Sequence, residues 1–143
     1  MAARMAPRKS DSPLAYLNGE FVAADEAQLP VWDRGVVQGA CVTEMIRTFQ
    51  RVPFRLEDHL ARLRSSLAYL GVFLAESDGE LASIIQRLIE SGAAGLAPRA
   101  DLGIVILVTP GSIPMYAGDV PVSTSATICI HTFSLPFRQW AGK

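Results

Sequence analysis

Three polar side chains in one leucine-rich segment could bind an anion. His59, Arg62 and Ser66 lie at positions i, i+3 and i+7, so in a helix they share one face beside the leucines. A guanidinium offers a planar fork of N–H donors, and a nearby imidazole and hydroxyl complete a donor set that suits a phosphate or a carboxylate. Taken alone, the pattern favours an ordinary surface salt bridge of Arg62 over a ligand site.

Two other groups of charged residues have simple structural interpretations. Glu44 and Arg47 lie in a predicted strand among apolar residues, where a cross-strand ion pair is the ordinary role. Glu57 and Asp58 open the predicted helix, where carboxylates interact favourably with the N-terminal end of the helix dipole. None of these four residues is predicted to react.

Lysine is almost missing from this chain of 143 residues. Of its 13 basic residues only Lys9 and Lys143 are lysines, one near the N-terminus and one at the last position. Catalysis by a buried lysine amine is therefore nearly excluded for this chain, and no catalytic residue is predicted in it.

Several other classes of function are also disfavoured. Cys41 and Cys129 are far apart, as are His59 and His131, so no metal site is predicted. The formal net charge of −1 argues against a protein that binds nucleic acid through bulk electrostatics. There is no secretory signal and no apolar run of the roughly 20 residues that a membrane span needs. We expect a cytoplasmic protein that binds neither nucleic acid nor membrane.

Strands are predicted on both sides of the helical region. Asn18-Gly19 between two short apolar runs predicts a hairpin over 14–23. Residues 29–34 should be extended and followed by a turn at Gly35 and Gly39. Further strands are expected over the ranges 40–49, 52–55, 102–109 and 124–133. In the strand over 40–49, Val42, Met45 and Ile46 are assigned to one face, and Thr43, Glu44 and Arg47 to the other. The run over 102–109 is apolar throughout, so burial on both faces is expected.

Two helices are predicted between these strands. Leucines at 56, 60, 63, 67 and 70 form one stripe, and Gly71 should end the first helix. A capping box over 77–80 starts the second helix, and Gly92 should close it. This order predicts an α+β fold, with two helices packed on a mostly antiparallel sheet.

The domain organisation follows from the same pattern. Residues 1–13 are interpreted as a disordered basic arm and residues 14–134 as one α+β domain. Residues 135–143 carry a Phe and a Trp without a predicted partner, so we interpret them as the start of a connection to another domain.

The ordered series of motifs resembles the opening of the class IV aminotransferases, the pyridoxal-phosphate (PLP) enzymes of fold type IV. The segments that carry the resemblance are 16–22 (YLNGEFV), 29–35 (LPVWDRG), 38–39 (QG), 43–47 (TEMIR) and 53–63 (PFRLEDHLARL). This family includes branched-chain and D-amino-acid aminotransferases and aminodeoxychorismate lyase. The resemblance implies that residues 14–134 form the small N-terminal domain, and that the C-terminal catalytic domain is absent.

The resemblance also implies roles for single residues. Arg62, in the His-Leu-x-Arg-Leu motif, corresponds to the arginine that holds the PLP phosphate, with His59 and Ser66 as neighbours. Gln38 and Thr43 correspond to positions that line the substrate pocket, and Tyr116 is a further candidate for that wall. Glu44 and Arg47 match the family's acidic and basic residues at these positions, and are interpreted as scaffold.

Departures from the family pattern limit what the resemblance implies. Val36, Val37 and Thr43 replace aromatic residues that are frequent there, and the loop 110–116 (PGSIPMY) lacks the arginine that D-amino-acid enzymes use to bind the substrate carboxylate. Lys143 lies in the wrong context, and too early in the chain, to be the Schiff-base lysine.

Three hypotheses follow from the sequence. The first is the N-terminal part of a PLP-dependent aminotransferase that moves an amino group between an amino acid and a 2-oxo acid, is a homodimer when intact, and is inactive as this chain alone. The second is a lyase of the aminodeoxychorismate type. The third is a non-catalytic binding or assembly module, for which exposed apolar surface would favour self-association.

Overall fold

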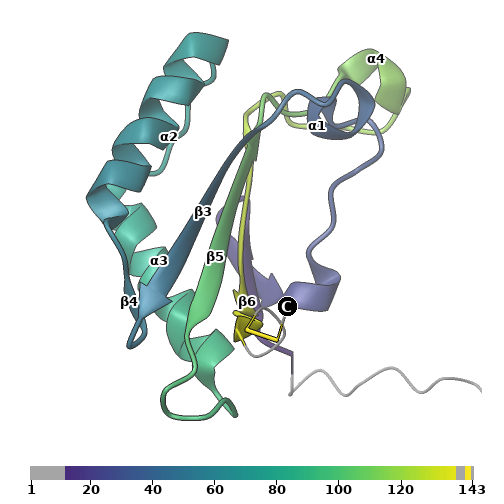
Figure 1. Ribbon diagram of the computed structural model, residues 1–143. Coiled ribbons are helices and arrows are strands. Elements are labelled where there is room, and N and C mark those ends of the chain that lie inside the picture. Colours follow the sequence, from purple (N-terminus) through teal and green to yellow (C-terminus); the bar gives the residue numbers. More distant parts are fainter. Residues whose placement is uncertain (1–11, 138–140, 143) are drawn as a thin grey trace, which may run out of the picture.

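The computed structural model describes residues 12–137 and 141–142, and its centre is a six-stranded sheet (Figure 1). The strands are β1 (Leu14–Leu17), β2 (Glu20–Ala23), β3 (Val42–Phe49), β4 (Val52–Pro53), β5 (Leu102–Thr109) and β6 (Thr127–Ser134). Their order in the sheet is β2-β1-β6-β5-β3-β4, and every neighbouring pair is antiparallel. The predicted α+β class with an antiparallel sheet is confirmed.

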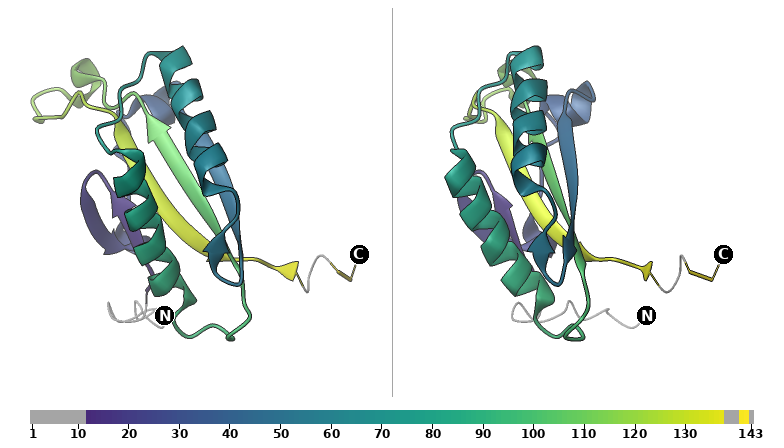
Figure 2. Two further views of the ribbon diagram at one scale, coloured as in Figure 1. Left: turned by 90° about the vertical axis from the view of Figure 1, so that its left-hand side faces the viewer. Right: turned by 60° about the vertical axis from the view of Figure 1, so that its left-hand side comes forward.

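Two long helices cover one face of this sheet. The helices α2 (Leu56–Leu70) and α3 (Asp78–Ala93) lie side by side on that face, and both turned views show the same layer (Figure 2). Between them and the sheet lies the core, made of the buried side chains of Leu60, Leu63, Leu67, Leu81, Ile85 and Leu88 from the helices and Ile46, Ile104, Ile106, Val108, Ile128 and Ile130 from the strands. The predicted leucine stripe is therefore buried at Leu60, Leu63 and Leu67, whereas Leu70 at its end is exposed.

Local signals fix the ends of several elements. Asn18 and Gly19 both have positive φ, as the tight turn between β1 and β2 requires. Gly71 ends α2 in the left-handed conformation, as predicted. The capping box is confirmed: Ser77 accepts a bond from the backbone of Glu80, and the Glu80 carboxylate accepts one from the backbone of Ser77.

The second helix does not close at Gly92 as expected, because it continues to Ala93. A Cβ at Gly92 would lie 2.3 Å from Oγ1 of Thr132 in β6, which is far too close. Glycine at this position therefore permits close packing of α3 on the sheet and is not a stop signal.

The faces predicted for the strand over 40–49 are right for Val42, Ile46, Thr43 and Arg47 and wrong for Glu44 and Met45. Glu44, Ile46 and Thr48 are buried toward the helices, whereas Thr43 and Met45 face the other way. Side chains alternate strictly along a strand, so Met45 cannot share a face with Ile46, whatever its hydrophobicity. By the same alternation, the charged Glu44, two residues before Ile46, lies on the helix-covered face.

Other predicted boundaries shift by a few residues. β3 begins at Val42, β6 begins at Thr127, and β4 stops at Pro53, because Arg55 takes a left-handed conformation with φ of 52° just before α2. On β5, four side chains toward the helices are fully buried, whereas those of Val105 and Leu107 on the other face are only half-buried. Burial on both faces is therefore incomplete.

Three short helical turns were not expected. They are a 3₁₀ turn η1 (Ala24–Glu26), α1 (Arg34–Val37) and α4 (Pro114–Ala117). The segment 29–34, predicted as extended, forms turns and a single bridge from Asp33 to Ser112. Residues 1–11 of the predicted basic arm and residues 138–140 and 143 of the predicted connection lie outside the described part of the chain.

Candidate functional site

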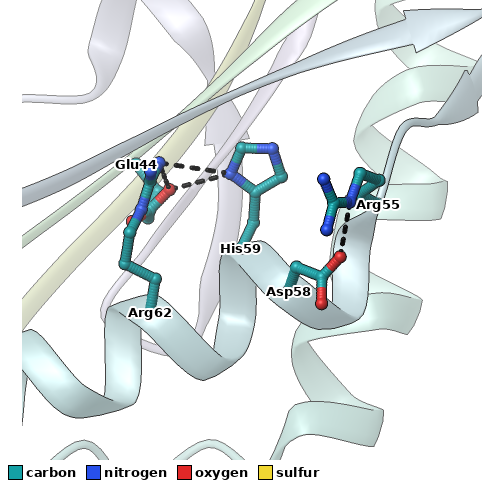
Figure 3. A network of polar contacts seen from close by, with 5 residues as sticks. All are labelled: Glu44, Arg55, Asp58, His59 and Arg62. Carbon is teal, nitrogen blue, oxygen red and sulfur yellow. Dashed lines mark hydrogen bonds and ion pairs between the residues drawn. The ribbon is translucent and has the colours of Figure 1, made fainter.

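Arg62 forms a two-pronged ion pair with a buried carboxylate (Figure 3). Its Nε donates to Oε1 of Glu44 and its Nη2 donates to Oε2, each at 2.7 Å. The Glu44 side chain is only 3 % exposed, whereas that of Arg62 is 66 % exposed. The carboxylate is therefore anchored inside the protein, and the guanidinium extends from it toward solvent.

His59 holds the same carboxylate from a second direction. Its Nδ1 lies 2.9 Å from Oε2 of Glu44. A carboxylate only accepts hydrogen bonds, so Nδ1 must carry the proton in this contact. Nη2 of Arg62 lies 3.5 Å from Nδ1 of His59, and because both groups are donors we assign no hydrogen bond between them.

These contacts shift the ionisation of the pair. Hydrogen bonding to Arg62, assisted by His59, lowers the pKa of Glu44 even though burial opposes this shift. The carboxylate in turn raises the pKa of Arg62 above its ordinary value. Glu44 is therefore a fixed anion, and Arg62 a fixed cation, at neutral pH.

Local structure explains why these three side chains meet. Glu44 lies on the helix-covered face of β3, and His59 and Arg62 are one turn apart on α2. The buried Leu60 and Leu63 set the rotation of α2 about its axis, which turns His59 and Arg62 toward β3. At the start of the helix, Arg55 is occupied by Asp58, with Nε 2.6 Å from Oδ2, and both side chains are exposed.

The guanidinium retains a free edge. An arginine has five N–H groups, and the Nε–Nη2 edge of Arg62 uses one from each nitrogen on Glu44. Within residues 12–137 and 141–142, both N–H groups of Nη1 and the second one of Nη2 remain for another ligand. Two parallel donors on such an edge suit phosphate or carboxylate oxygens.

The structure does not add all the predicted neighbours to this cluster. Ser66, one turn beyond Arg62, contributes no hydrogen bond to it among the described residues. An ion pair between Glu44 and Arg47 is not formed, because the two side chains lie on opposite faces of β3. Arg47 instead stacks on Phe49, with its Cζ 3.7 Å from the ring centroid. Its Nη2 also forms a long ion pair with Oδ2 of Asp101, at 3.9 Å.

The three predicted substrate-pocket residues lie at one end of the sheet. Gln38 caps the C-terminus of α1, Thr43 follows the start of β3, and Tyr116 lies in α4; all three side chains are exposed. Figure 1 shows α1 and α4 together at this end. Because Thr43 and Glu44 point to opposite faces of β3, these residues do not form one cluster with Arg62 in the structure. The structure also has a hollow of about 850 Å³ beside residues 71–76 and 121–128. Neither Arg62 nor the three predicted substrate-pocket residues line it.

A residue to which the sequence interpretation gave no role links α1 to β6. Asp33 is fully buried; its Oδ1 accepts from the backbone N–H of Gly35, and its Oδ2 accepts from the Thr127 hydroxyl, each at 2.7 Å. Backbone bonds from Arg34 to Gly111 and from Ile113 to Trp32 join the start of α1 to residues 111–113, directly before α4. An aspartate two residues before a glycine is a capping signal that could have indicated this short helix.

The described residues give two further findings. Within residues 12–137 and 141–142, no group of three or more His, Cys, Asp or Glu side chains is arranged to hold a metal ion. No helix in this part of the chain is long and apolar enough to cross a membrane.

Comparison with known proteins points to one family. Residues 41–141 match the family model described as amino-transferase class IV. The D-alanine aminotransferase of Bacillus licheniformis is 33% identical over 117 residues, which cover 79% of this chain and 40% of that protein. A putative branched-chain-amino-acid aminotransferase of Methanocaldococcus jannaschii is 34% identical over 70 residues, which cover 49% of this chain and 24% of that protein.

Solved structures show the same fold. The branched-chain aminotransferase of Thermoproteus uzoniensis, crystallised with norvaline, has a TM-score of 0.69 at 26% identity, over 85% of this chain and 40% of that one. A PLP-bound hypothetical aminotransferase from Mycobacterium tuberculosis has a TM-score of 0.72 over 90% of this chain and 42% of its own, and at 16% identity this likeness concerns the fold alone. The chain thus spans about 40% of the length of the D-alanine aminotransferase that it matches.

Proposed function

Because this chain belongs to the class IV aminotransferase family, we propose that it forms the phosphate-binding part of a PLP-dependent aminotransferase, in which Arg62 holds the phosphate of the cofactor. The observation that carries the proposal is the free edge of Arg62, presented to solvent while the other edge is fixed on buried Glu44. A phosphate group is anionic and has several acceptor oxygens, so it matches that edge in both charge and geometry.

The donor set fits one end of the cofactor. When bound, PLP supplies an electron sink that stabilises negative charge on the reacting carbon of an amino acid. Residues 12–137 and 141–142 contain no lysine that could hold the cofactor covalently, so the proposal assigns Arg62 to the phosphate and leaves the amine unassigned. The reaction proposed for the whole protein is transfer of an amino group between an amino acid and a 2-oxo acid, and the chain alone should not catalyse it.

We assign one wall of the substrate pocket to the end of the sheet that carries α1 and α4. Gln38, Thr43 and Tyr116 are the residues proposed for this wall, and their exposed side chains at one end of the sheet support it. Asp33 would hold the wall in shape, because it joins α1 to β6 through Thr127. The relatives act on D-alanine or branched-chain amino acids by name, and the proposed substrate class is an amino acid without a stated side chain or stereochemistry.

A binding experiment on the 143-residue chain tests the proposed role of Arg62. The probe is pyridoxamine 5′-phosphate, which carries the cofactor ring and phosphate but has no aldehyde to react with lysines, and pyridoxamine is the matched probe without phosphate. We expect the wild-type chain to prefer the phosphorylated probe, and the Arg62→Ala variant to lose that preference. Equal binding of both probes by the wild type, or an unchanged preference in Arg62→Ala, would overturn the assignment.

A second experiment tests the expectation that the chain alone is inactive. The chain is incubated with PLP, reduced with borohydride and mapped by mass spectrometry, and amino transfer from an amino acid to a 2-oxo acid is assayed in parallel. We expect no transfer above that of free PLP and no stoichiometric modification. A stoichiometric adduct on Lys143 together with turnover would contradict this expectation.

A further inference from the structure

We propose that Glu44 is a positioning residue that aims the free edge of Arg62 at the cofactor phosphate, an inference that rests on the function proposed above. The family resemblance assigns only the arginine to the phosphate. The structure adds the residue that fixes where this arginine points.

The first support is the stereochemistry of the pair. Glu44 occupies the Nε–Nη2 edge of the guanidinium with two bonds of 2.7 Å. The guanidinium is planar, so fixing one edge also fixes the direction of the Nη1–Nη2 edge. Glu44 therefore does not compete for the donors that a phosphate would use, and it determines their direction before any ligand arrives.

The second support is the contrast in burial between the two partners. Glu44 is 3 % exposed and its strand is paired with β5 through neighbouring residues, so the carboxylate has a fixed place. Arg62 is 66 % exposed, and an exposed arginine without a partner would sample many rotamers. Holding the side chain in its binding conformation reduces the entropy that is lost when a ligand binds.

The third support is His59, which donates to the same carboxylate from the other side at 2.9 Å. Oε2 of Glu44 accepts from both His59 and Arg62, so the carboxylate cannot rotate without breaking a bond. His59 is thus a support for Glu44, and it reaches the ligand only through Glu44 and Arg62.

Charge alone predicts the opposite effect for Glu44. A carboxylate beside the binding arginine cancels most of its charge, so removing it would strengthen the attraction for a phosphate by Coulomb's law. If Glu44 acts by positioning, its removal should weaken phosphate binding. The sign of the change therefore distinguishes a positioning residue from a competing anion.

The test measures the affinity of the full chain for pyridoxamine 5′-phosphate and for pyridoxamine by NMR titration. We expect Glu44→Gln, which keeps the shape of the side chain, to bind the phosphorylated probe about tenfold more weakly and to bind pyridoxamine unchanged. The matched control is Glu57→Gln, which removes the same charge from an exposed position on α2, the helix that carries Arg62, and should change neither affinity. Unchanged or tighter binding of the phosphorylated probe by Glu44→Gln would overturn the proposal.

A double-variant cycle separates this inference from the proposed function. If Glu44 acts only through Arg62, then Glu44→Gln has no further effect in a chain that already carries Arg62→Ala. Loss of phosphate preference in Arg62→Ala together with wild-type binding by Glu44→Gln would refute the positioning role alone. Absence of any phosphate preference in the wild type would refute the proposed function.

A measurement on the unmodified chain guards against a Glu44 variant that does not fold. The Nε–H group of Arg62 has its own ¹⁵N signal, whose relaxation reports motion of the side chain. We expect this group to be as rigid as the backbone of α2 without any ligand. Mobility typical of an exposed arginine would contradict the proposal.

Discussion

At the scale of single residues, Glu44 shows how a carboxylate can be buried at moderate cost. An ionised group without partners would be strongly destabilised at this position. Here its two oxygens accept three hydrogen bonds, two from Arg62 and one from His59. The result is an anion whose charge is balanced at the surface and whose position is set by the core.

This arrangement predicts how stability depends on pH. The pKa of Glu44 is lowered in the folded chain below its ordinary value of 4.5. Its ionic contacts therefore stabilise the fold fully above that pH, and the contribution is lost as the pH falls through the lowered pKa. We expect Glu44→Gln to lower the free energy of unfolding by about 2 kcal/mol at pH 7. This difference from the wild type should shrink steadily as the pH falls, as measured by urea unfolding monitored by circular dichroism.

The comparison variant for this prediction is Arg62→Ala. Without the guanidinium the buried carboxylate loses the largest cause of its lowered pKa while burial still opposes ionisation, so the pKa of Glu44 should be higher than in the wild type. Acid should then destabilise Arg62→Ala less than it destabilises the wild type. A Glu44→Gln deficit that stays constant from pH 7 to pH 3 would contradict the assigned ionisation.

The sequence could predict Arg62 as a candidate but not its partner. Helical spacing places His59 and Arg62 on one face, and that inference needs only local geometry. Glu44 is far from both in sequence, and it was interpreted as scaffold on the polar face of its strand. Strict alternation along β3, counted from Ile46, would have placed Glu44 on the helix-covered side.

At the scale of elements, α3 is defined by a cap at one end and by a close approach near the other. The capping box over Ser77 and Glu80 starts it, and Gly92 lets its last turn lie directly on Thr132. The two glycines of this helix therefore differ in their roles. Around Gly79, in the first turn, an added Cβ would meet nothing within 4 Å.

Matched substitutions test that difference. Gly79→Ala should stabilise the chain by up to about 1 kcal/mol, because alanine favours helix and limits the unfolded chain. Gly92→Ala gains the same propensity but forces Thr132 aside, so a net loss of about 1–3 kcal/mol is expected. Thermal unfolding of the two variants beside the wild type measures both effects, and equal shifts in the same direction would refute the packing role of Gly92.

Elements that depend on local signals were predictable, and elements that depend on distant contacts were not. The hairpin at Asn18-Gly19 and the two long helices follow from turn chemistry and apolar spacing. The short helix α1 depends instead on Asp33, whose carboxylate reaches Thr127 in β6, 94 positions further along the chain. The capping signal at Asp33 is local, but no pattern within residues 29–39 records Thr127, and the prediction was an extended segment over 29–34 followed by a turn at Gly35 and Gly39.

At the scale of the whole molecule, the two faces of the sheet are unequal. The helices α2 and α3 cover one face, and the other carries no long helix in the described residues (Figure 1). Across this open face Met45 pairs with Val105, and Val105 pairs with His131. The Met45 side chain is 63 % exposed, and Phe49 on the same strand face is 49 % exposed.

Exposed apolar side chains on one face predict that the chain associates with copies of itself, because their burial would be favourable. Sedimentation over a range of concentrations should show a dimer or a larger species for the wild type. Met45→Glu places a charge on the open face and should shift the chain toward monomer. The matched control is Tyr69→Glu, at a 91 % exposed position on α2, which should leave association unchanged. A wild-type chain that remains monomeric at all concentrations would contradict the prediction, and equal effects of the two variants would show that the open face is not responsible.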